Sequence, residues 1–153
     1  MKKFIIIGII SLFCTIPSTA QGKKEGREKI KTLKIAYITE QLQLTTGEAQ
    51  KFWPVYNAYD EEQHSLRRSY RFTLKQAIKE NESIDKLSEN ESKKLISLKL
   101  STDKKLNESQ EDFTKKIAQI ISANKIIKLQ IAEIEFGRNL MRKYKHKKSD
   151  SKN

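Results

Sequence analysis

Apolar side chains recur along most of this chain at steps of three, four and seven residues, the spacing of one face of an α-helix. Four segments follow this spacing: 27–43, 46–80, 89–121 and 122–145. The alternation of apolar and polar residues that is typical of β-strands does not occur in the sequence. A composition rich in Lys, Glu, Ile, Leu, Gln and Ala also favours helices. The pattern therefore predicts an all-α fold of about four helices.

Two of the predicted helices begin with a leucine, a hydroxyl residue and, three positions after the hydroxyl residue, a glutamate. The two sets are Leu44, Thr45 and Glu48, and Leu87, Ser88 and Glu91. In such a capping box, each of the two polar side chains accepts a hydrogen bond from the backbone N–H of the other residue. Ser122 is the expected N-cap of the fourth helix, with Lys125 in the place of the glutamate.

Pro54 falls inside the second predicted helix, where it lacks a backbone donor and predicts a kink. The third predicted helix, 89–121, would be roughly 50 Å long at about 1.5 Å per residue. Between residues 101 and 112 its only large apolar side chain is Leu106, which suits packing against one neighbour. We therefore expect an elongated antiparallel helical hairpin. Its half-covered apolar faces would be closed by a second copy, forming a homodimer, or by a client protein.

The first twenty residues have the organisation of a secretory signal peptide. Two lysines precede an apolar run at 4–13, and small residues at Ser18 and Ala20 fit cleavage before Gln21. The run is about a dozen residues long, whereas a membrane span needs roughly 20. Cleavage would remove Cys14, the only cysteine, so the mature chain would form no disulfide.

The mature chain is long enough for one domain, which we place at 27–145, after a flexible stretch at 21–26 and before a disordered basic tail at 146–153. The net charge of +12 is concentrated towards the two ends, and the middle is balanced. This distribution does not predict a nucleic-acid-binding face. The basic ends are either simply solvated or attracted to an anionic surface, such as membrane headgroups or an acidic partner.

Catalytic and cofactor-binding motifs do not occur in the sequence, so we expect neither an enzyme nor a cofactor. Asp60 and His64 are one helical turn apart and could supply half of a metal site at most. The other histidine, His146, lies in the basic tail. A metal ion is therefore not expected, although metal sensing stays open as an alternative.

Four aromatic residues close together in the second helix form the candidate partner-binding surface: Phe52, Trp53, Tyr56 and Tyr59. Three of them share one helical face and also fit an ordinary core. Trp53 lies off that face by roughly 100°. For Trp53, therefore, a partner-facing position is as well supported as a core position.

Three blocks of the sequence carry a family resemblance. The segment from Leu44 to Glu48 looks like the Leu-Thr-x-x-Gln motif of the Spy/CpxP family of periplasmic stress proteins. Residues 48–59, with their Phe-Trp-Pro-x-Tyr sequence, resemble the branch of small exported proteins known as sensors of ECF-type sigma factors. Residues 132–136, Ala-Glu-Ile-Glu-Phe, fit the last helix of that branch. The likeness extends over nearly the whole mature chain.

This resemblance implies a bent antiparallel helical hairpin that dimerises into a cradle in the periplasm. Family members bind unfolded proteins or inhibit envelope-stress sensors. The chain departs from the family motif at two positions. Glu48 stands where the motif has a glutamine, and Lys125 stands at the matching position in the third copy of the pattern, at the start of the fourth predicted helix.

The leading hypothesis is an exported, non-enzymatic protein of the envelope-stress response. It would bind a regulatory partner, such as a membrane-bound anti-sigma factor, or unfolded clients. One alternative is a holdase like the Skp-type chaperones, which need a β-rich trimerisation core. The other is a periplasmic metal sensor that uses His64.

Overall fold

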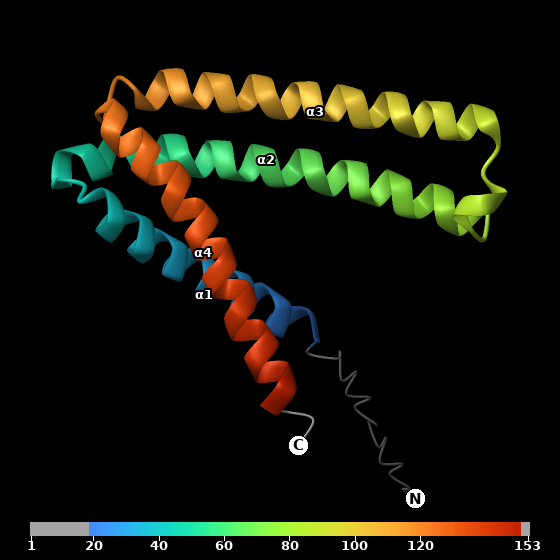
Figure 1. Ribbon diagram of the computed structural model, residues 1–153, viewed down its shortest axis with the longest axis horizontal. Coiled ribbons are helices and arrows are strands. Elements are labelled where there is room, and N and C mark those ends of the chain that lie inside the picture. Colours follow the sequence, from blue (N-terminus) through green and yellow to red (C-terminus); the bar gives the residue numbers. More distant parts are fainter. Residues whose placement is uncertain (1–18, 151–153) are drawn as a thin grey trace, which may run out of the picture. The chain divides into compact units, whose positions relative to one another are not determined.

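The computed structural model describes residues 19–150, which form four α-helices and one short 3-10 helix (Figure 1). In chain order these are α1 (Thr19–Leu42), α2 (Thr46–Glu80), η1 (Ile84–Lys86), α3 (Glu89–Ile117) and α4 (Ala123–Asp150). Over this described range there is no strand. The all-α fold predicted from the sequence is therefore confirmed.

The chain divides into two compact units, Met1–Ile35 and Ala36–Asn153, and the boundary falls within α1. The described part of the first unit is the beginning of α1. The second unit contains the end of α1 and the whole of α2, α3 and α4 as described. All the packing and surfaces reported below belong to this second unit.

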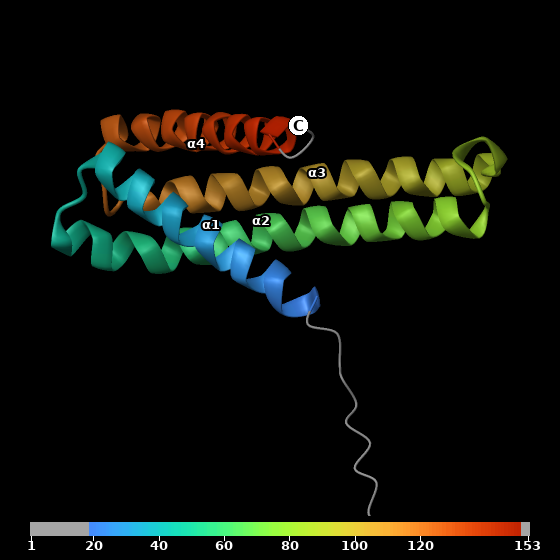
Figure 2. The ribbon, with the colours of Figure 1, turned by 90° about the horizontal axis from the view of Figure 1, so that it is seen from below.

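α2 and α3 lie side by side as an antiparallel hairpin (Figures 1 and 2). Contacts between them run along much of their length. The rings of Tyr59 and Phe113 stack with their centroids 4.1 Å apart. Further along the pair, Gln63 Nε2 donates to the backbone oxygen of Leu106 at 2.9 Å. The antiparallel hairpin expected from the thin apolar stripe is therefore present.

The helix limits agree with the sequence prediction for α2 and differ at three other places. α1 begins at Thr19 and covers 21–26, which we expected to be flexible, and α4 continues to Asp150 through most of the tail that we expected to be disordered. Both stretches lack proline and contain lysines that favour helix, whereas Gly22 and Gly26 in the first stretch disfavour it. Residues 1–18 and 151–153 lie outside the described part, and with them most of the predicted signal peptide.

α3 ends at Ile117, four residues before the predicted end. Residues 118–120 form a tight turn, in which the Ile120 N–H bonds to the Ile117 oxygen at 2.9 Å. This turn lets both Ile117 and Ile121 enter the core, since their side chains are 1% and 4% exposed. Packing, rather than helix propensity, therefore decides where α3 ends.

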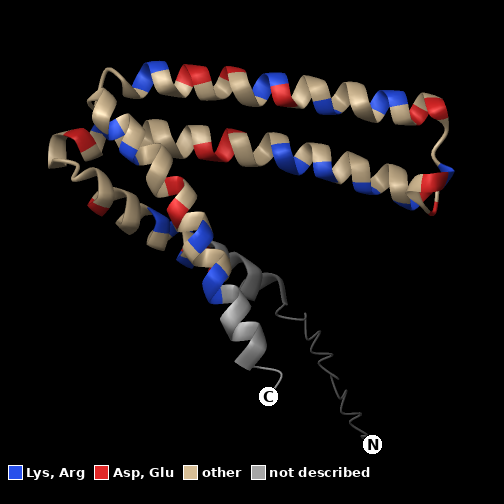
Figure 3. Cartoon of the chain, viewed as in Figure 1, with Lys and Arg blue, Asp and Glu red and all other residues tan. Residues whose placement is uncertain are grey.

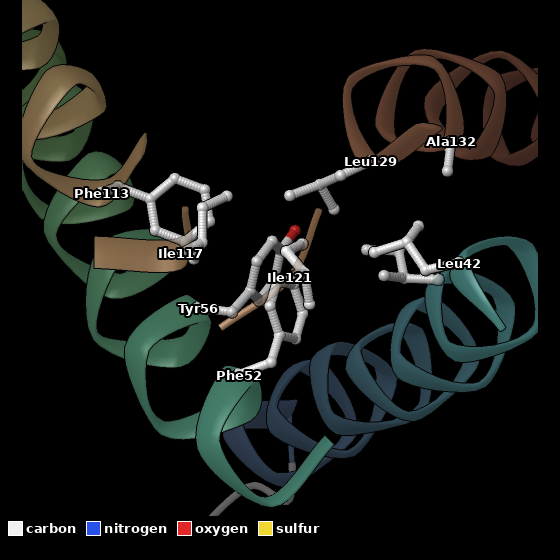
Figure 4. Packing of buried hydrophobic residues seen from close by; sticks show 9 residues of the cluster. Leu42, Phe52, Tyr56, Phe113, Ile117, Ile121, Leu129 and Ala132 are labelled. Carbon is white, nitrogen blue, oxygen red and sulfur yellow. The ribbon is translucent and has the colours of Figure 1, made fainter. Parts of the chain in front are cut away.

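Nine buried residues from the four helices and the α3–α4 turn form one core (Figure 4). They are Ile38, Leu42, Phe52, Tyr56, Phe113, Ile117, Ile121, Leu129 and Ala132. All of them lie near the ends of the hairpin helices that join α1 and α4. From residue 64 to residue 101, by contrast, no side chain is buried. We call residues 64–101 the distal arm.

Pro54 lies inside α2, and the helix continues on both sides of it. Because proline has no N–H, the carbonyl of Gln50 loses its usual helical donor at this point. The kink that the sequence predicts here stays a prediction.

Candidate functional site

Both predicted capping boxes form, and they begin α2 and α3. Thr45 Oγ1 accepts the backbone N–H of Glu48 at 3.2 Å, and Glu48 Oε2 accepts the backbone N–H of Thr45 at 2.8 Å. Ser88 and Glu91 make the same pair of bonds at 3.2 and 3.0 Å. Hydrogen bonds from Ser88 also hold the pKa of the Glu91 carboxyl below its usual value.

The start of α4 binds the start of α2. Ser122 Oγ accepts the backbone N–H of Lys125 at 3.4 Å, as expected of an N-cap. The Lys125 ammonium lies 2.7 Å from Glu48 Oε2 and 3.0 Å from the backbone oxygen of Gln43. Glu48 and Lys125 therefore form an ion pair that links α4 to the α1–α2 turn.

This ion pair also affects the titration of Glu48. The hydrogen bond from Lys125 is the main cause of a lowered Glu48 pKa, and the backbone N–H of Thr45 adds to the effect. Both groups stabilise the carboxylate over the neutral acid. Glu48 therefore serves two contacts through one oxygen, namely the helix cap and the link to α4.

The aromatic cluster belongs mainly to the core. Phe52 and Tyr56 are 0% and 2% exposed, and their rings stack with centroids 5.4 Å apart (Figure 4). Trp53 packs edge-on against both rings and is partly buried, as is Tyr59. Phe52 and Tyr56 therefore fit the core interpretation and are closed to a partner, whereas Trp53 and Tyr59 keep some exposed surface.

Two tyrosines bind the glutamates of the last helix. The Tyr56 hydroxyl donates to Glu133 Oε1 at 2.7 Å, and the Tyr37 hydroxyl donates to Glu135 Oε2 at 2.9 Å. Burial, followed by the charge of Glu133, raises the Tyr56 pKa far above its ordinary value. The aromatic block at 48–59 is thus joined to the block at 132–136.

An open groove of about 820 Å³ runs between α2 and α3. Its apolar lining consists of Pro54, Val55, Ala58, Tyr59, Leu66 and Phe113. Its charged lining consists of Glu62, Glu108, Glu111, Asp112, Lys105, Lys115 and Lys116. Charges of both signs also follow each other along the two helices (Figure 3). An apolar and aromatic surface bordered by both charges suits a segment of another protein better than nucleic acid.

A second apolar surface lies on α4, on the side away from the core. Its large side chains are half exposed or more: Ile127, Ile131, Ile134 and Met141. The buried residues Leu129 and Ala132 lie on the opposite side of the same helix. α4 is therefore apolar on two faces, of which the rest of the described chain covers one.

His64 makes a single polar contact, with Asp60 at 3.6 Å on the same helix. Among the described residues, no group of three or more His, Cys, Asp or Glu side chains is arranged to hold a metal ion. The described helices also include none with a hydrophobic stretch of the length that a membrane span requires.

Sequence reasoning missed the groove, because which α3 residues meet Ala58 and Tyr59 depends on how the two helices align. The outer face of α4 did leave a signal. Apolar residues in 122–145 are too numerous for one helical face, and this excess marks a second face.

In comparisons with known proteins, no family model, no curated protein and no solved structure matches the chain.

Proposed function

We propose that this chain is an exported, non-enzymatic helical protein of the envelope-stress response, which acts by binding a segment of another protein in the α2–α3 groove. The bound protein is a regulatory partner, such as a membrane-bound anti-sigma factor, or an unfolded client. The periplasmic location and the stress role rest on the sequence resemblance. The groove is the single observation that carries the binding function.

The groove supports this proposal through its size and its chemistry. The partly exposed ring of Tyr59, which stacks on the buried ring of Phe113, offers an apolar surface, and aromatic residues often supply much of the binding energy in protein interfaces. Lysine and glutamate side chains border that surface, so they could bind the backbone and polar groups of an extended or helical segment.

Binding can be measured by fluorescence anisotropy with a reduced and permanently unfolded model protein, and separately with the purified periplasmic domain of an anti-sigma factor. The test variant is Ala58→Arg, which places a long side chain in the groove from an exposed position on α2. The matched control is Ser69→Arg, also exposed on α2 and outside the groove lining. Ala58→Arg should weaken binding on the order of tenfold, and Ser69→Arg should leave it unchanged.

The result distinguishes the hypotheses. Binding to the unfolded protein alone indicates a chaperone, and binding to the anti-sigma domain alone indicates a regulator. Binding that Ala58→Arg leaves intact contradicts the groove as the site, and binding to neither probe contradicts the proposed function.

The basic ends should add a salt-dependent part to this binding. If they attract an acidic or membrane-bound partner, the affinity should fall as ionic strength rises. A titration from about 50 mM to 500 mM salt tests this prediction. An affinity that does not change with salt would contradict attraction of the partner by the basic ends.

The two alternatives have their own measurements. A Skp-type holdase would sediment as a trimer, although the β-rich core of such trimers has no counterpart among residues 19–150. A metal sensor would bind zinc or copper stoichiometrically in calorimetry, with loss of binding in His64→Ala.

A further inference from the structure

The exposed apolar residues of α4 are spaced as in a coiled coil. Ile127, Ile131, Ile134 and Met141, with Arg138 among them, follow one another at steps of four, three, four and three residues. This is the repeat by which two helices pack along a seam. The three isoleucines are 55%, 51% and 55% exposed, so the seam has no partner within the described part of the chain.

We propose that this outer face of α4 binds the same face of a second copy, with the two helices antiparallel. In the register that we infer, Ile131 of each copy packs against Ile134 of the other. Ile127 then packs against the aliphatic part of Arg138 of the other copy. The interface shares no residue with the groove, so it can hold or fail independently of the proposed function.

Charges beside the seam select this orientation and register. In an antiparallel pair with Ile131 against Ile134, Lys128 of each copy lies beside Glu135 of the other. Both side chains are exposed on α4. The hydrogen bond from Tyr37 to Glu135 Oε2 also fixes the position of this carboxylate. The symmetric dimer thus gains two ion pairs and brings no like charges together at these positions.

The neighbouring arrangements all bring like charges together. A shift by one heptad in one direction places Glu135 beside Glu135 and Lys128 beside Arg142, and a shift in the other direction places Lys128 beside Lys128. A parallel pair stacks Arg138 on Arg138 within the seam. Like charges at such positions disfavour pairing, so one arrangement is preferred.

The inferred interface is short, because it has only four layers built on isoleucine, and Met141 beyond them lies opposite the polar Asn124 of the other copy. It therefore falls in the class of small, weak interfaces, and the dimer should dissociate on dilution. Sedimentation equilibrium of the full chain over a wide concentration range should show a monomer–dimer equilibrium. A chain that stays monomeric at the highest concentrations overturns the proposal.

Charge reversal tests the register directly. Lys128→Glu and Glu135→Lys should each raise the dissociation constant on the order of tenfold, since each turns two attractive pairs into repulsive ones. An equimolar mixture of the two variants should restore dimerisation, because the opposite charges then meet again. Failure of the mixture to associate better than either variant alone contradicts the inferred register.

Two control variants, Ile96→Lys and Tyr37→Phe, separate loss of the inferred interface from a general effect of substitution on association. Ile131→Lys should abolish dimerisation, whereas Ile96→Lys, at an isoleucine of α3 that is 60% exposed, should not. Tyr37→Phe removes the hydrogen bond to Glu135 and leaves the charges unchanged, so it should affect dimerisation much less than Glu135→Lys does.

A zero-length carbodiimide cross-link gives a second readout, because it joins a lysine amine only to a carboxylate in direct contact. In a mixture of ¹⁵N-labelled and unlabelled chains, mass spectrometry should find Lys128 of one chain joined to Glu135 of the other. Intermolecular links confined to other positions overturn the proposal.

Discussion

Single side chains in this protein connect parts of the chain that are far apart in sequence. Glu48 caps α2 and binds Lys125 at the start of α4, and Tyr56 binds Glu133 further along that helix. Each of the two contacts bridges 77 positions. Glutamine at position 48 could still cap the helix, but it would lack the charge for the ion pair. The charge of Glu48 therefore adds a link to α4 that the helix cap alone does not supply.

The link between Glu48 and Lys125 should make stability depend on acidity. The folded pKa of Glu48 is lowered, so its contribution is present above the unfolded pKa of about 4.3 and is lost as pH falls through the folded pKa. Lys125→Met removes the main cause of that lowering. Between pH 7 and pH 3, urea unfolding should show a larger loss of stability in the original protein than in Lys125→Met.

The matched control for this prediction is Lys75→Met, an exposed position on α2. It should retain the full pH dependence of the original protein. Equal losses in the original protein and in Lys125→Met would mean that the ion pair does not contribute in solution.

Tyr56→Phe should lower the free energy of unfolding by about 1.5–3 kcal/mol, because a hydrogen bond to a charged group is lost in a mostly buried place. The partner left behind is the Glu133 carboxylate. Chemical denaturation at pH 7 measures the change. Tyr70→Phe, at a partly exposed tyrosine of the distal arm, should change stability little. If Tyr56→Phe left the free energy of unfolding unchanged, water would be replacing the hydroxyl as the partner of Glu133 without cost.

At the scale of whole helices, the starts of α2, α3 and α4 could be predicted from sequence, whereas the start of α1 and the ends of α3 and α4 could not. A capping box is local, since its two side chains are three residues apart. The starts of α2 and α3 can therefore be recognised from short sequence motifs. The end of α3 depends on Ile121 entering a core built by distant segments. In the same way, the pairing of Glu48 with Lys125 has no local signal.

The candidate sites, like the helix limits, could be predicted from sequence only where they depend on local spacing. The aromatic residues were recognised from their spacing, and the core interpretation fits Phe52 and Tyr56, but the groove depends on the alignment of α2 with α3. Contacts such as that of Gln63 with Leu106 fix this alignment. A single sequence does not reveal which residues of two long helices stand opposite each other, because their apolar stripes permit several registers.

Thr45→Ala should cost about 1 kcal/mol of stability, the usual effect of losing an N-cap. Its hydroxyl satisfies the Glu48 N–H, which has no helical partner. Thermal or urea unfolding measures the loss. Thr45→Ser keeps the hydroxyl and should restore most of the stability, whereas Thr46→Ala, at the next exposed position, should be nearly neutral. Equal effects at positions 45 and 46 would argue against a specific capping role.

At the scale of the second unit, stability is distributed unevenly. Every fully buried large side chain lies near the helix ends that join α1 and α4, and none lies in the distal arm. Regions with few buried apolar contacts open locally at a smaller free-energy cost than global unfolding. Residues 64–101 should therefore open more often than the core.

This arrangement has a consequence for the turnover of the protein. The distal arm contains exposed basic residues, among them Arg67, Arg68 and Lys94, so brief trypsin digestion should cut there first and leave the core halves associated. Mass spectrometry of the first fragments checks this, and first cuts at 44–60 would contradict it. Because such a cut needs only local opening, the lifetime of the molecule among proteases would depend on the arm rather than on the stability of the core.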